Sequence, residues 1–313
     1  MSAPEYAIEA IGLEKTYAAS GKMPEKRALK GIDLKIPRGH IFGLLGPNGA
    51  GKSTFINILA GLVVKTGGTA RIWGMDIDEH PRASRAAIGV VNQEITMDPF
   101  FTPKEALELQ AGFYGVPKGE RRTSEILDAV GLLDKADAYV RQLSGGMKRR
   151  LMVAKALVHN PPVLILDEPT AGVDVELRRS LWAYVRRLHD LGTTIILTTH
   201  YLEEAEELCD EIAIVNHGEI IASEPTPKLL KRLDQRLLKV TPREPLTSVP
   251  ASLSNLDVEL KADGVLQFVY RNTETGIGRI LEQVREAGIS IADLSTDQPN
   301  LEDVFVSMTT ETA

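Results

Sequence analysis

Nine consecutive residues restrict the fold of this 313-residue chain more than any other part of it: Gly46-Pro47-Asn48-Gly49-Ala50-Gly51-Lys52-Ser53-Thr54. They match the pattern G-x-x-x-x-G-K-[ST]. Glycine has no Cβ, so the backbone N–H groups of such a loop can converge on phosphate oxygens without a steric clash. We therefore expect all nine residues to bind the phosphates of a nucleotide.

The flanking residues support this interpretation. The apolar run Ile41–Leu45 predicts a buried strand before the loop, and Ser53–Leu59 predicts a helix after it. The N-terminus of that helix adds a partial positive charge where phosphates would bind. We expect the Lys52 ammonium to contact the β- and γ-phosphates and the Ser53 hydroxyl to bind Mg²⁺.

A second motif places two acids at the end of a strand. The apolar run Val163–Leu166 is followed directly by Asp167 and Glu168. Carboxylates are rarely buried without a partner, so two of them after a buried strand need either solvent or a function. A solvated strand end is the simple alternative. Beside a phosphate loop, Asp167 is expected to hold Mg²⁺ and Glu168 to activate the attacking water.

Short apolar strands alternate with amphipathic helical segments through the first two-thirds of the chain. Brief apolar runs of this kind are typical of buried parallel strands. The alternation predicts an α/β fold with helices on both faces of a mostly parallel sheet. The expected strands are Ile41–Leu45, Ile88–Val91, Val163–Leu166, Thr194–Thr199 and Ile212–Val215.

The pattern changes near residue 220, where prolines interrupt it. We expect a linker helix over 225–236, within a helical stretch at about Lys228–Leu238, and then a small α+β domain over 237–313. The elements expected in this domain are strands at Val258–Leu260 and Leu266–Tyr270 joined by an Asp263-Gly264 turn, a helix marked by Ile277 to Val284, a strand at Ile289–Leu294, and a last helix capped by Asn300.

Composition limits the compartment and the partners. The chain is 43% hydrophobic and 25% charged, and its net charge of −7 argues against a nucleic-acid coat. The single cysteine, Cys209, cannot form an internal disulfide, which fits a reducing compartment. The N-terminus shows no signal-peptide pattern, and no run of about 18 apolar residues predicts a membrane span. We expect a cytoplasmic protein that reaches a membrane only through a partner.

A third motif, Leu143-Ser144-Gly145-Gly146-Met147, opens an amphipathic helix. Ser144 is a good helix N-cap, and the glycines leave backbone N–H groups free to face an anion. An ordinary capped helix would have the same pattern. Together with the phosphate loop and the Asp167-Glu168 pair, however, the motif resembles the signature motif of ABC proteins. Over residues 6–224 the chain resembles the ATP-binding subunit of an ABC transporter.

The resemblance implies a P-loop NTPase core with an N-terminal antiparallel β subdomain and a helical subdomain at about 94–160. It also implies roles for individual residues. Tyr17 matches the aromatic that stacks on adenine, and Gln93 matches the glutamine that touches Mg²⁺ and relays the nucleotide state. Asp174 matches the D-loop aspartate, and His200 matches the histidine that contacts the γ-phosphate. Considered singly, Tyr17 could be a packing aromatic, Gln93 a turn residue and His200 a satisfied histidine at a strand end.

The family mechanism implied by the resemblance uses two copies of the chain. Each ATP would lie between Gly46–Thr54 of one copy and Ser144–Gly146 of the other. Glu168 would activate water, His200 would orient the γ-phosphate, and Lys52 with Mg²⁺ would neutralise the developing charge. Loss of the γ-phosphate would open the homodimer.

The segment Leu197–Glu206 and the tail Asn300–Phe305 resemble the ABC-2 branch. This implies an exporter of drugs, lipids or polysaccharides, driven from the inner face of the cell membrane through a separate transmembrane permease. Phe100, Phe101 and Pro103 are candidate permease contacts, or else they pack within the helical subdomain.

Two other classes of protein compete with this interpretation. A GTPase would need a guanine-reading N-K-x-D motif, which the sequence lacks. A non-transport ABC ATPase of DNA repair or translation generally carries long coiled coils, zinc cysteines or tandem cassettes, whereas this sequence has one phosphate loop and one signature motif.

Overall fold

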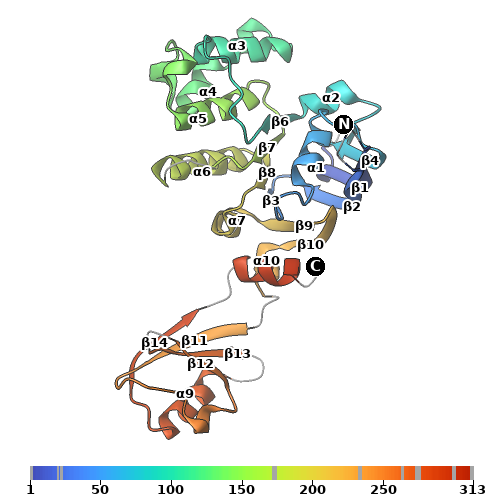
Figure 1. Cartoon of the computed structure of the whole chain (residues 1–313). Coiled ribbons are helices and arrows are strands. Elements are labelled where there is room, and N and C mark those ends of the chain that lie inside the picture. Colours follow the sequence, from blue (N-terminus) through green and yellow to red (C-terminus); the bar gives the residue numbers. More distant parts are fainter. Residues whose placement is uncertain are drawn as a thin grey trace. The chain divides into compact units, whose positions relative to one another are not determined.

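The computed structural model describes residues 3–19, 21, 24–170, 175–231, 235–261, 264–271, 276–297 and 301–310 (Figure 1). The chain divides into two compact units, Met1–Pro225 and Thr226–Ala313. Within the described ranges, no helix is long and apolar enough to cross a membrane.

The first unit is built on a six-stranded sheet of order β10-β9-β3-β8-β7-β6, parallel except for β10, which pairs antiparallel with β9. The central strand β3 is buried along its whole length because apolar side chains and one glycine fill both of its faces. The strand that leads into the phosphate loop is therefore fixed in the core. The strand bounds are β3 Ile41–Leu45, β6 Ile88–Val91, β7 Val163–Asp167, β8 Thr194–Thr198, β9 Glu211–Asn216 and β10 Glu219–Pro225.

An antiparallel sheet of order β2-β1-β4-β5 forms the second layer of this unit. In β2, Ile32, Leu34 and Ile36 are buried at every second position, so one face of the sheet packs into the core. Both sheets confirm the predicted fold class. The bounds are β1 Tyr6–Tyr17, β2 Lys26–Pro37, β4 Gly67–Ile72 and β5 Met75–Asp76.

Helices complete the unit. Helix α1, Lys52–Leu59, begins at the end of the phosphate loop and buries Phe55 and Ile58. Helices α3, α4 and α5 form a separate helical group beside the core sheet (Figure 1). This group has its own apolar cluster, which includes Leu107, Ile126 and Leu151. The remaining helices of the unit are α2 Pro81–Ala86, α3 Pro103–Phe113, α4 Thr123–Ala129, α5 Gly145–Ala156, α6 Val175–Asp190 and α7 Leu202–Leu208, with 3-10 turns η1 Lys118–Glu120, η2 Leu133–Lys135 and η3 Val140–Gln142.

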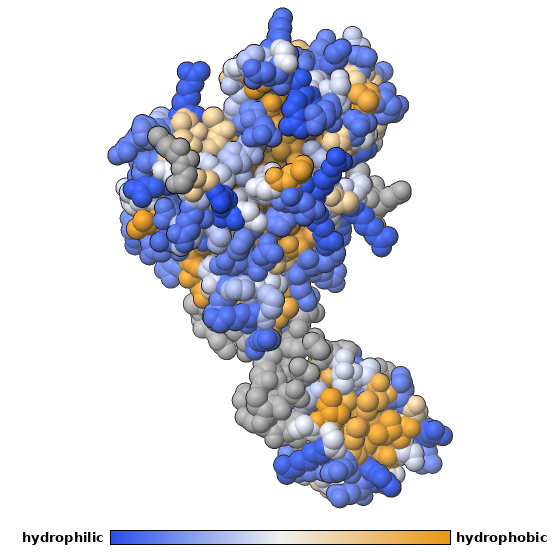
Figure 2. Space-filling view, turned by 180° about the vertical axis from the view of Figure 1, so that it is seen from behind, coloured by the Kyte–Doolittle hydropathy of each residue, from blue (hydrophilic) through white to orange (hydrophobic). Residues whose placement is uncertain are grey.

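The second unit is a four-stranded antiparallel sheet of order β12-β13-β11-β14 packed against helix α9. Leu238, Phe268 and Val284 lie in its buried core. Figure 2 shows hydrophobic side chains gathered on one face of this unit. Its elements are α8 Thr226–Leu230, β11 Gln235–Pro242, η4 Ala251–Leu253, β12 Asp257–Leu260, β13 Leu266–Arg271, α9 Ile277–Glu286, β14 Ile291–Asp297 and α10 Leu301–Thr310.

The predicted linker helix over 225–236 is wrong in its second half. Helix α8 ends at Leu230, and strand β11 begins at Gln235. Buried Leu238 and Val240 alternate with half-buried residues, and β11 pairs with both β13 and β14, so sheet pairing overrides the local helical preference. Asp263 and Asn300, predicted in a turn and a cap, lie outside the described residues.

Gly89 of β6 provides a test of how the helical group meets the core sheet. A Cβ at this position would lie 2.2 Å from the carbonyl oxygen of Ala156, at the end of α5. We expect Gly89→Ala to lower the free energy of unfolding by about 1–3 kcal/mol through this overpacking. In α3, Gly112 has only an ordinary contact at 3.6 Å, so the control Gly112→Ala should be neutral or stabilising. Urea unfolding measures both, and equal stability of the two variants would contradict the close approach.

Candidate functional site

The phosphate loop turns sharply out of β3 because two of its glycines cannot be replaced. A Cβ on Gly46 would lie 2.2 Å from the carbonyl oxygen of Val215, and one on Gly51 would lie 2.8 Å from that of Ala28. Gly51 also has a φ of 117°, a conformation that other residues rarely adopt. These close contacts fix the path of the backbone, and the loop leads directly into α1.

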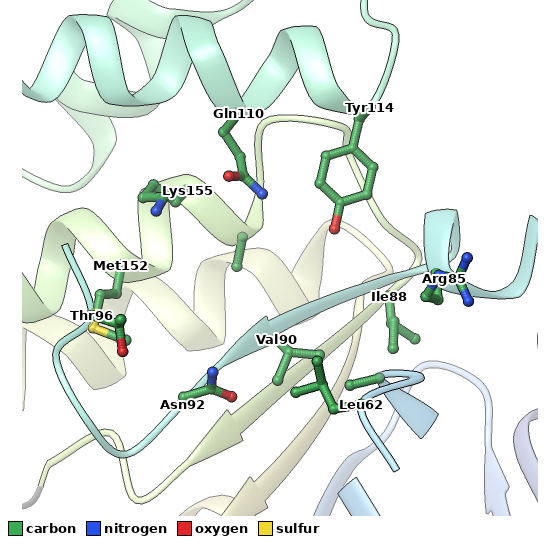
Figure 3. A pocket seen from close by; sticks show the side chains of 12 residues that line it. Leu62, Arg85, Ile88, Val90, Asn92, Thr96, Gln110, Tyr114, Met152 and Lys155 are labelled. Atoms are coloured by element: carbon green, nitrogen blue, oxygen red, sulfur yellow. The ribbon is translucent and has the colours of Figure 1, made fainter. Parts of the chain in front are cut away.

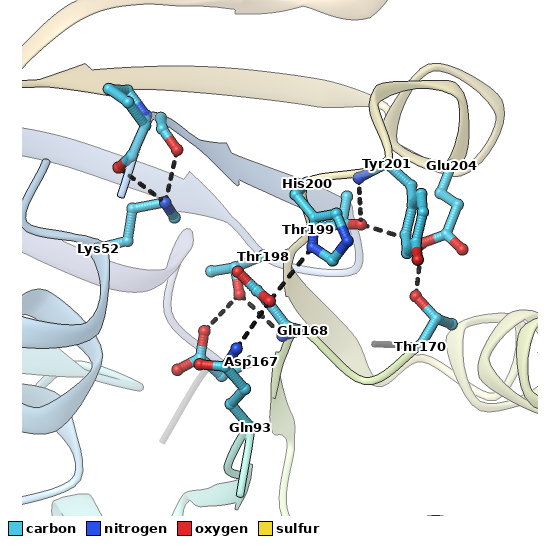
Figure 4. Close-up of polar contacts among 12 residues, drawn as sticks. Lys52, Gln93, Asp167, Glu168, Thr170, Thr198, Thr199, His200, Tyr201 and Glu204 are labelled. Atoms are coloured by element: carbon cyan, nitrogen blue, oxygen red, sulfur yellow. Dashed lines mark hydrogen bonds and ion pairs between the residues drawn. The ribbon is translucent and has the colours of Figure 1, made fainter. Parts of the chain in front are cut away.

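Lys52, the first residue of α1, folds back over the loop (Figure 4). Its Nζ donates hydrogen bonds to the carbonyl oxygens of Gly46, at 2.6 Å, and Pro47, at 3.2 Å. Burial lowers the pKa of Lys52, while the charges of Glu168 and Asp167 oppose this shift. A buried cation held by carbonyl groups would gain from an anion, so this position suits a phosphate.

A cavity of about 160 Å³ lies at the loop. It brings together half of the predicted nucleotide contacts, which are Tyr17 and six residues of the phosphate loop, with Gln93 and Glu168. Lys26 and Ala28 also line it, and no motif pointed to them; they reach the cavity because β2 pairs with β1, with Lys26 opposite Tyr17. The lining residues are Tyr17, Lys26, Ala28, Asn48, Gly49, Gly51, Lys52, Ser53, Thr54, Gln93 and Glu168.

The Glu168 carboxylate contacts two of the other predicted catalytic residues, Gln93 and His200 (Figure 4). Its Oε2 accepts a hydrogen bond from Gln93 Nε2 at 2.9 Å and lies 3.2 Å from His200 Nδ1. Its φ is +48°, in the left-handed region where a non-glycine residue is uncommon. The backbone N–H of Glu168 donates to the hydroxyl of Thr198, which helps to stabilise this turn.

Thr198, which the motif analysis missed, also binds the neighbouring acid. Its hydroxyl donates to Asp167 Oδ1 at 2.5 Å. Burial raises the pKa of Asp167, and the Thr198 hydrogen bond opposes that shift. The only signal in the sequence is that two threonines precede His200 in a buried strand, a pattern that packing alone also explains.

Arg149 is a second residue that sequence analysis missed. It is buried on α5, and its side chain donates to the carbonyl oxygens of Asn92, at 3.1 Å, and Gln93, at 2.6 Å. Arg149 therefore ties the segment that carries Gln93 to the helix opened by Ser144. An arginine in a basic stretch gives no sequence signal that it is buried.

The signature residues lie outside the nucleotide cavity. Ser144 caps α5 by accepting a hydrogen bond from Met147 N at 3.2 Å, and neither it nor Gly145 or Gly146 lines the cavity. The predicted Asp174 falls outside the described residues.

The residues beside the cavity suit Mg²⁺ shared with a substrate. Within the ranges that the structure describes, no group of three or more His, Cys, Asp or Glu side chains is placed to hold a metal ion. Mg²⁺ commonly takes one or two carboxylates, keeps water and shares phosphate oxygens. The carboxylate of Asp167, the Ser53 hydroxyl and the Gln93 amide provide such a partial donor set.

A second cavity, of about 220 Å³, lies between the helical group and the core (Figure 3). Arg85 and Lys155 are its cationic residues, and among the residues that the structure describes no acidic one lines it. Burial lowers the pKa of Lys155. The lining residues are Ala60, Leu62, Arg85, Ile88, Val90, Asn92, Thr96, Gln110, Tyr114, Met152, Lys155 and Ala156.

Comparison with known proteins decides the family. Residues 29–171 match the ABC transporter family model. The daunorubicin/doxorubicin resistance ATP-binding protein DrrA of Streptomyces peucetius is 36% identical over 314 residues, covering 98% of this chain and 93% of that protein. The chain belongs to the ATP-binding proteins of ABC transporters.

Other relatives agree with this assignment. The Nod factor export ATP-binding protein I of Ralstonia nicotianae is 36% identical, with 98% of this chain and 94% of that protein covered. A solved dimer of the ATP-binding cassette MJ0796, in a post-hydrolysis state with ADP and Pi, has a TM-score of 0.63 and 30% identity, covering 70% of this chain and 98% of that one. This ABC protein is an ATPase, as predicted.

The buried ammonium of this ABC ATPase gives a direct test of the cavity. Lys52→Ala should weaken ATP binding roughly 10- to 100-fold, because a charge-assisted contact to phosphate is lost. Lys26→Ala, which removes an exposed ammonium from the same cavity, should change the affinity much less. Titration calorimetry measures both variants, and an unchanged affinity for Lys52→Ala would exclude Lys52 from the phosphate site.

Proposed function

We propose that two copies of this ABC ATPase bind Mg²⁺ and ATP between them, hydrolyse the ATP and thereby drive export through a separate membrane permease. The observation that carries the proposal is the contact of Gln93 and His200 with one carboxylate oxygen of Glu168, beside a cavity lined by the phosphate loop. Relatives named for drug resistance and Nod factor export support the direction of transport.

The proposal assigns a task to each residue of the site, and two tasks to Gln93. The loop N–H groups and Lys52 hold the β- and γ-phosphates, and Glu168 takes a proton from the attacking water. His200 orients the γ-phosphate, while Gln93 keeps the Glu168 carboxylate aimed at the water. Asp167, Ser53 and Gln93 would hold Mg²⁺, which when bound neutralises charge that develops on the phosphate oxygens.

A second copy would complete the site. Ser144 and Gly145 are exposed at the N-terminus of the twelve-residue helix α5, outside their own nucleotide cavity. A helix N-terminus attracts an anion, so this surface can receive the γ-phosphate held by another copy. Tyr17 is 39% exposed at the cavity, with the Lys15 ammonium 4.8 Å from the centroid of its ring, and this ring would stack on adenine. The dimeric state of the solved cassette supports this arrangement, in which Asp174 is also expected to take part.

Glu168→Gln tests the catalytic assignment. The amide cannot accept a proton, so we expect the rate of ATP hydrolysis to fall at least about 100-fold while ATP still binds and the dimer accumulates. The control Glu203→Gln, at an exposed position of α7, should keep both the rate and the monomer–dimer balance. Phosphate release and size-exclusion chromatography give the two readouts. A near-normal rate would remove Glu168 as the base.

The 220 Å³ cavity suits a segment of the permease. Its rim exposes apolar side chains, with Leu62 68% and Tyr114 38% exposed, and its two cations face no acid within it. A short permease helix with apolar residues and a carboxylate would complement this surface. Of the predicted contact residues, Phe100 is 68% exposed, Phe101 is half-buried and Pro103 is buried at the start of α3. Binding there would hold the protein at the inner face of the membrane.

Charge reversal in this cavity tests the permease contact. Lys155→Glu combined with Arg85→Glu should release the protein from membranes that contain the permease, because the new charges repel a carboxylate. ATP hydrolysis by the isolated protein should stay within about twofold, since neither residue lines the nucleotide cavity. Lys35→Glu, on strand β2, is the matched control, and co-sedimentation with native membranes is the measurement. Equal retention of both variants would contradict this docking site.

A further inference from the structure

Glu204 of helix α7 is a buried acid that the proposed mechanism does not use. Its side chain is 7% exposed; Oε2 is hydrogen-bonded, whereas Oε1 has an ion-pair contact that does not form a hydrogen bond. Oε2 accepts hydrogen bonds from the hydroxyls of Thr170, at 2.9 Å, and Thr199, at 3.1 Å (Figure 4). Oε1 lies 3.2 Å from Nε of Arg178 on helix α6. A charge buried to this degree persists only when such partners compensate for the lost water.

These contacts fix the residues on both sides of His200. Thr199, which precedes it, donates to Glu204 and accepts a hydrogen bond from the backbone N–H of Tyr201 at 3.0 Å. Tyr201, which follows it, lies under the guanidinium of Arg178, with 4.4 Å between that group and the ring centroid. The rings of His200 and Tyr201 are 4.1 Å apart. The backbone around His200 is therefore held through Glu204 and Arg178.

The same carboxylate also contacts both sides of the segment that contains Asp174. Thr170 lies just before the undescribed residues 171–174, and Arg178 lies in the first turn of the helix that follows them. In the proposed dimer, this segment belongs to the contact between copies. One buried group thus contacts Thr170 and Arg178 on either side of this segment and Thr199 beside His200.

We propose that Glu204 is a positioning residue that holds His200 against Glu168 and couples its position to the 170–178 segment. The proposal rests on the catalytic role given to His200 above. It requires a charged acceptor, because Glu204 must accept from two hydroxyls and pair with a guanidinium at the same time. The NH₂ group of a glutamine would face either the guanidinium, which is also a donor, or the two hydroxyls, whose hydrogen bonds would then have to reverse direction.

Helix α7 supplies a matched control for the experiment. Glu207 pairs with Arg186 at 2.7 Å between the same two helices, but both side chains are at least half exposed. We expect Glu204→Gln to lower kcat about 10- to 100-fold with KM for ATP within about twofold, because His200 is misplaced while the phosphate loop is intact. Glu207→Gln should leave kcat unchanged.

The decisive measurement is the effect of Glu204→Gln in a protein that lacks the His200 imidazole. In a His200→Ala background, Glu204→Gln should reduce single-turnover hydrolysis by less than about twofold, because residues that act as one unit are not additive. An equal loss in both backgrounds, or an unchanged kcat in the single variant, would overturn the inference and leave the proposed function intact. A normal rate for His200→Ala alone would instead overturn the role of His200.

A second variant covers a failure to fold. If circular dichroism shows that Glu204→Gln is unfolded, Arg178→Gln takes its place, because Arg178 is 27% exposed and its removal leaves the two threonine contacts. The same loss of kcat and the same absence of further loss beside His200→Ala are expected. Additive losses for this variant would also overturn the inference.

Discussion

The site depends on how closely the backbone leaves strand β3 against strand β9. The Gly46 backbone passes so near the carbonyl group of Val215 that a Cβ would lie 2.2 Å from its oxygen. This contact sets the direction of the loop, and the loop in turn sets where α1 begins and where Lys52 can reach. The cost of burying that ammonium is offset locally by two carbonyl groups and two nearby acids. The remaining residues of the site are arranged around this buried positive charge.

Both acids lie at the end of strand β7 and Thr198 lies at the end of its neighbour β8, because parallel strands end at the same edge of the sheet. Strand β7 pairs with β8, and Asp167 lies opposite Thr198. The Thr198 hydroxyl donates to one acid and accepts from the backbone of the next, so it supports the unusual left-handed turn at Glu168. That turn points the Glu168 carboxylate at Gln93 and His200 instead of along the strand. A strained backbone conformation at this point is understandable, because it places a base where a strand alone would not.

Short motifs could be predicted from the sequence because each follows from local geometry. A glycine-rich loop, a strand that ends in acids and a serine-capped helix need no knowledge of distant residues. The missed groups Arg149, Thr198 and Glu204 each have a partner at least 31 residues away in the chain, and Lys26 reaches the cavity through the pairing of two strands. Arg149 contacts residues 56 positions before it, and its charge suggests exposure although it is buried. The helix predicted where β11 begins was wrong for the same reason, because the strands that pair with β11 come later in the sequence.

Two of the ion pairs between α6 and α7 show why burial must be known before a charge can be interpreted. In sequence, Glu204 and Glu207 are two acids of one acidic helix, and Arg178 and Arg186 are two cations of one basic helix. The exposed pair, Glu207–Arg186, has the shorter distance, 2.7 Å against 3.2 Å. Solvent screens that pair, so it contributes little to stability. The buried pair cannot lose one partner without stranding a charge, and only this pair also contacts the segment that carries His200. The Glu204–Arg178 pair is therefore the more important of the two although its distance is longer. The burial of the two charges decides their effect on the protein more than the distance between them does.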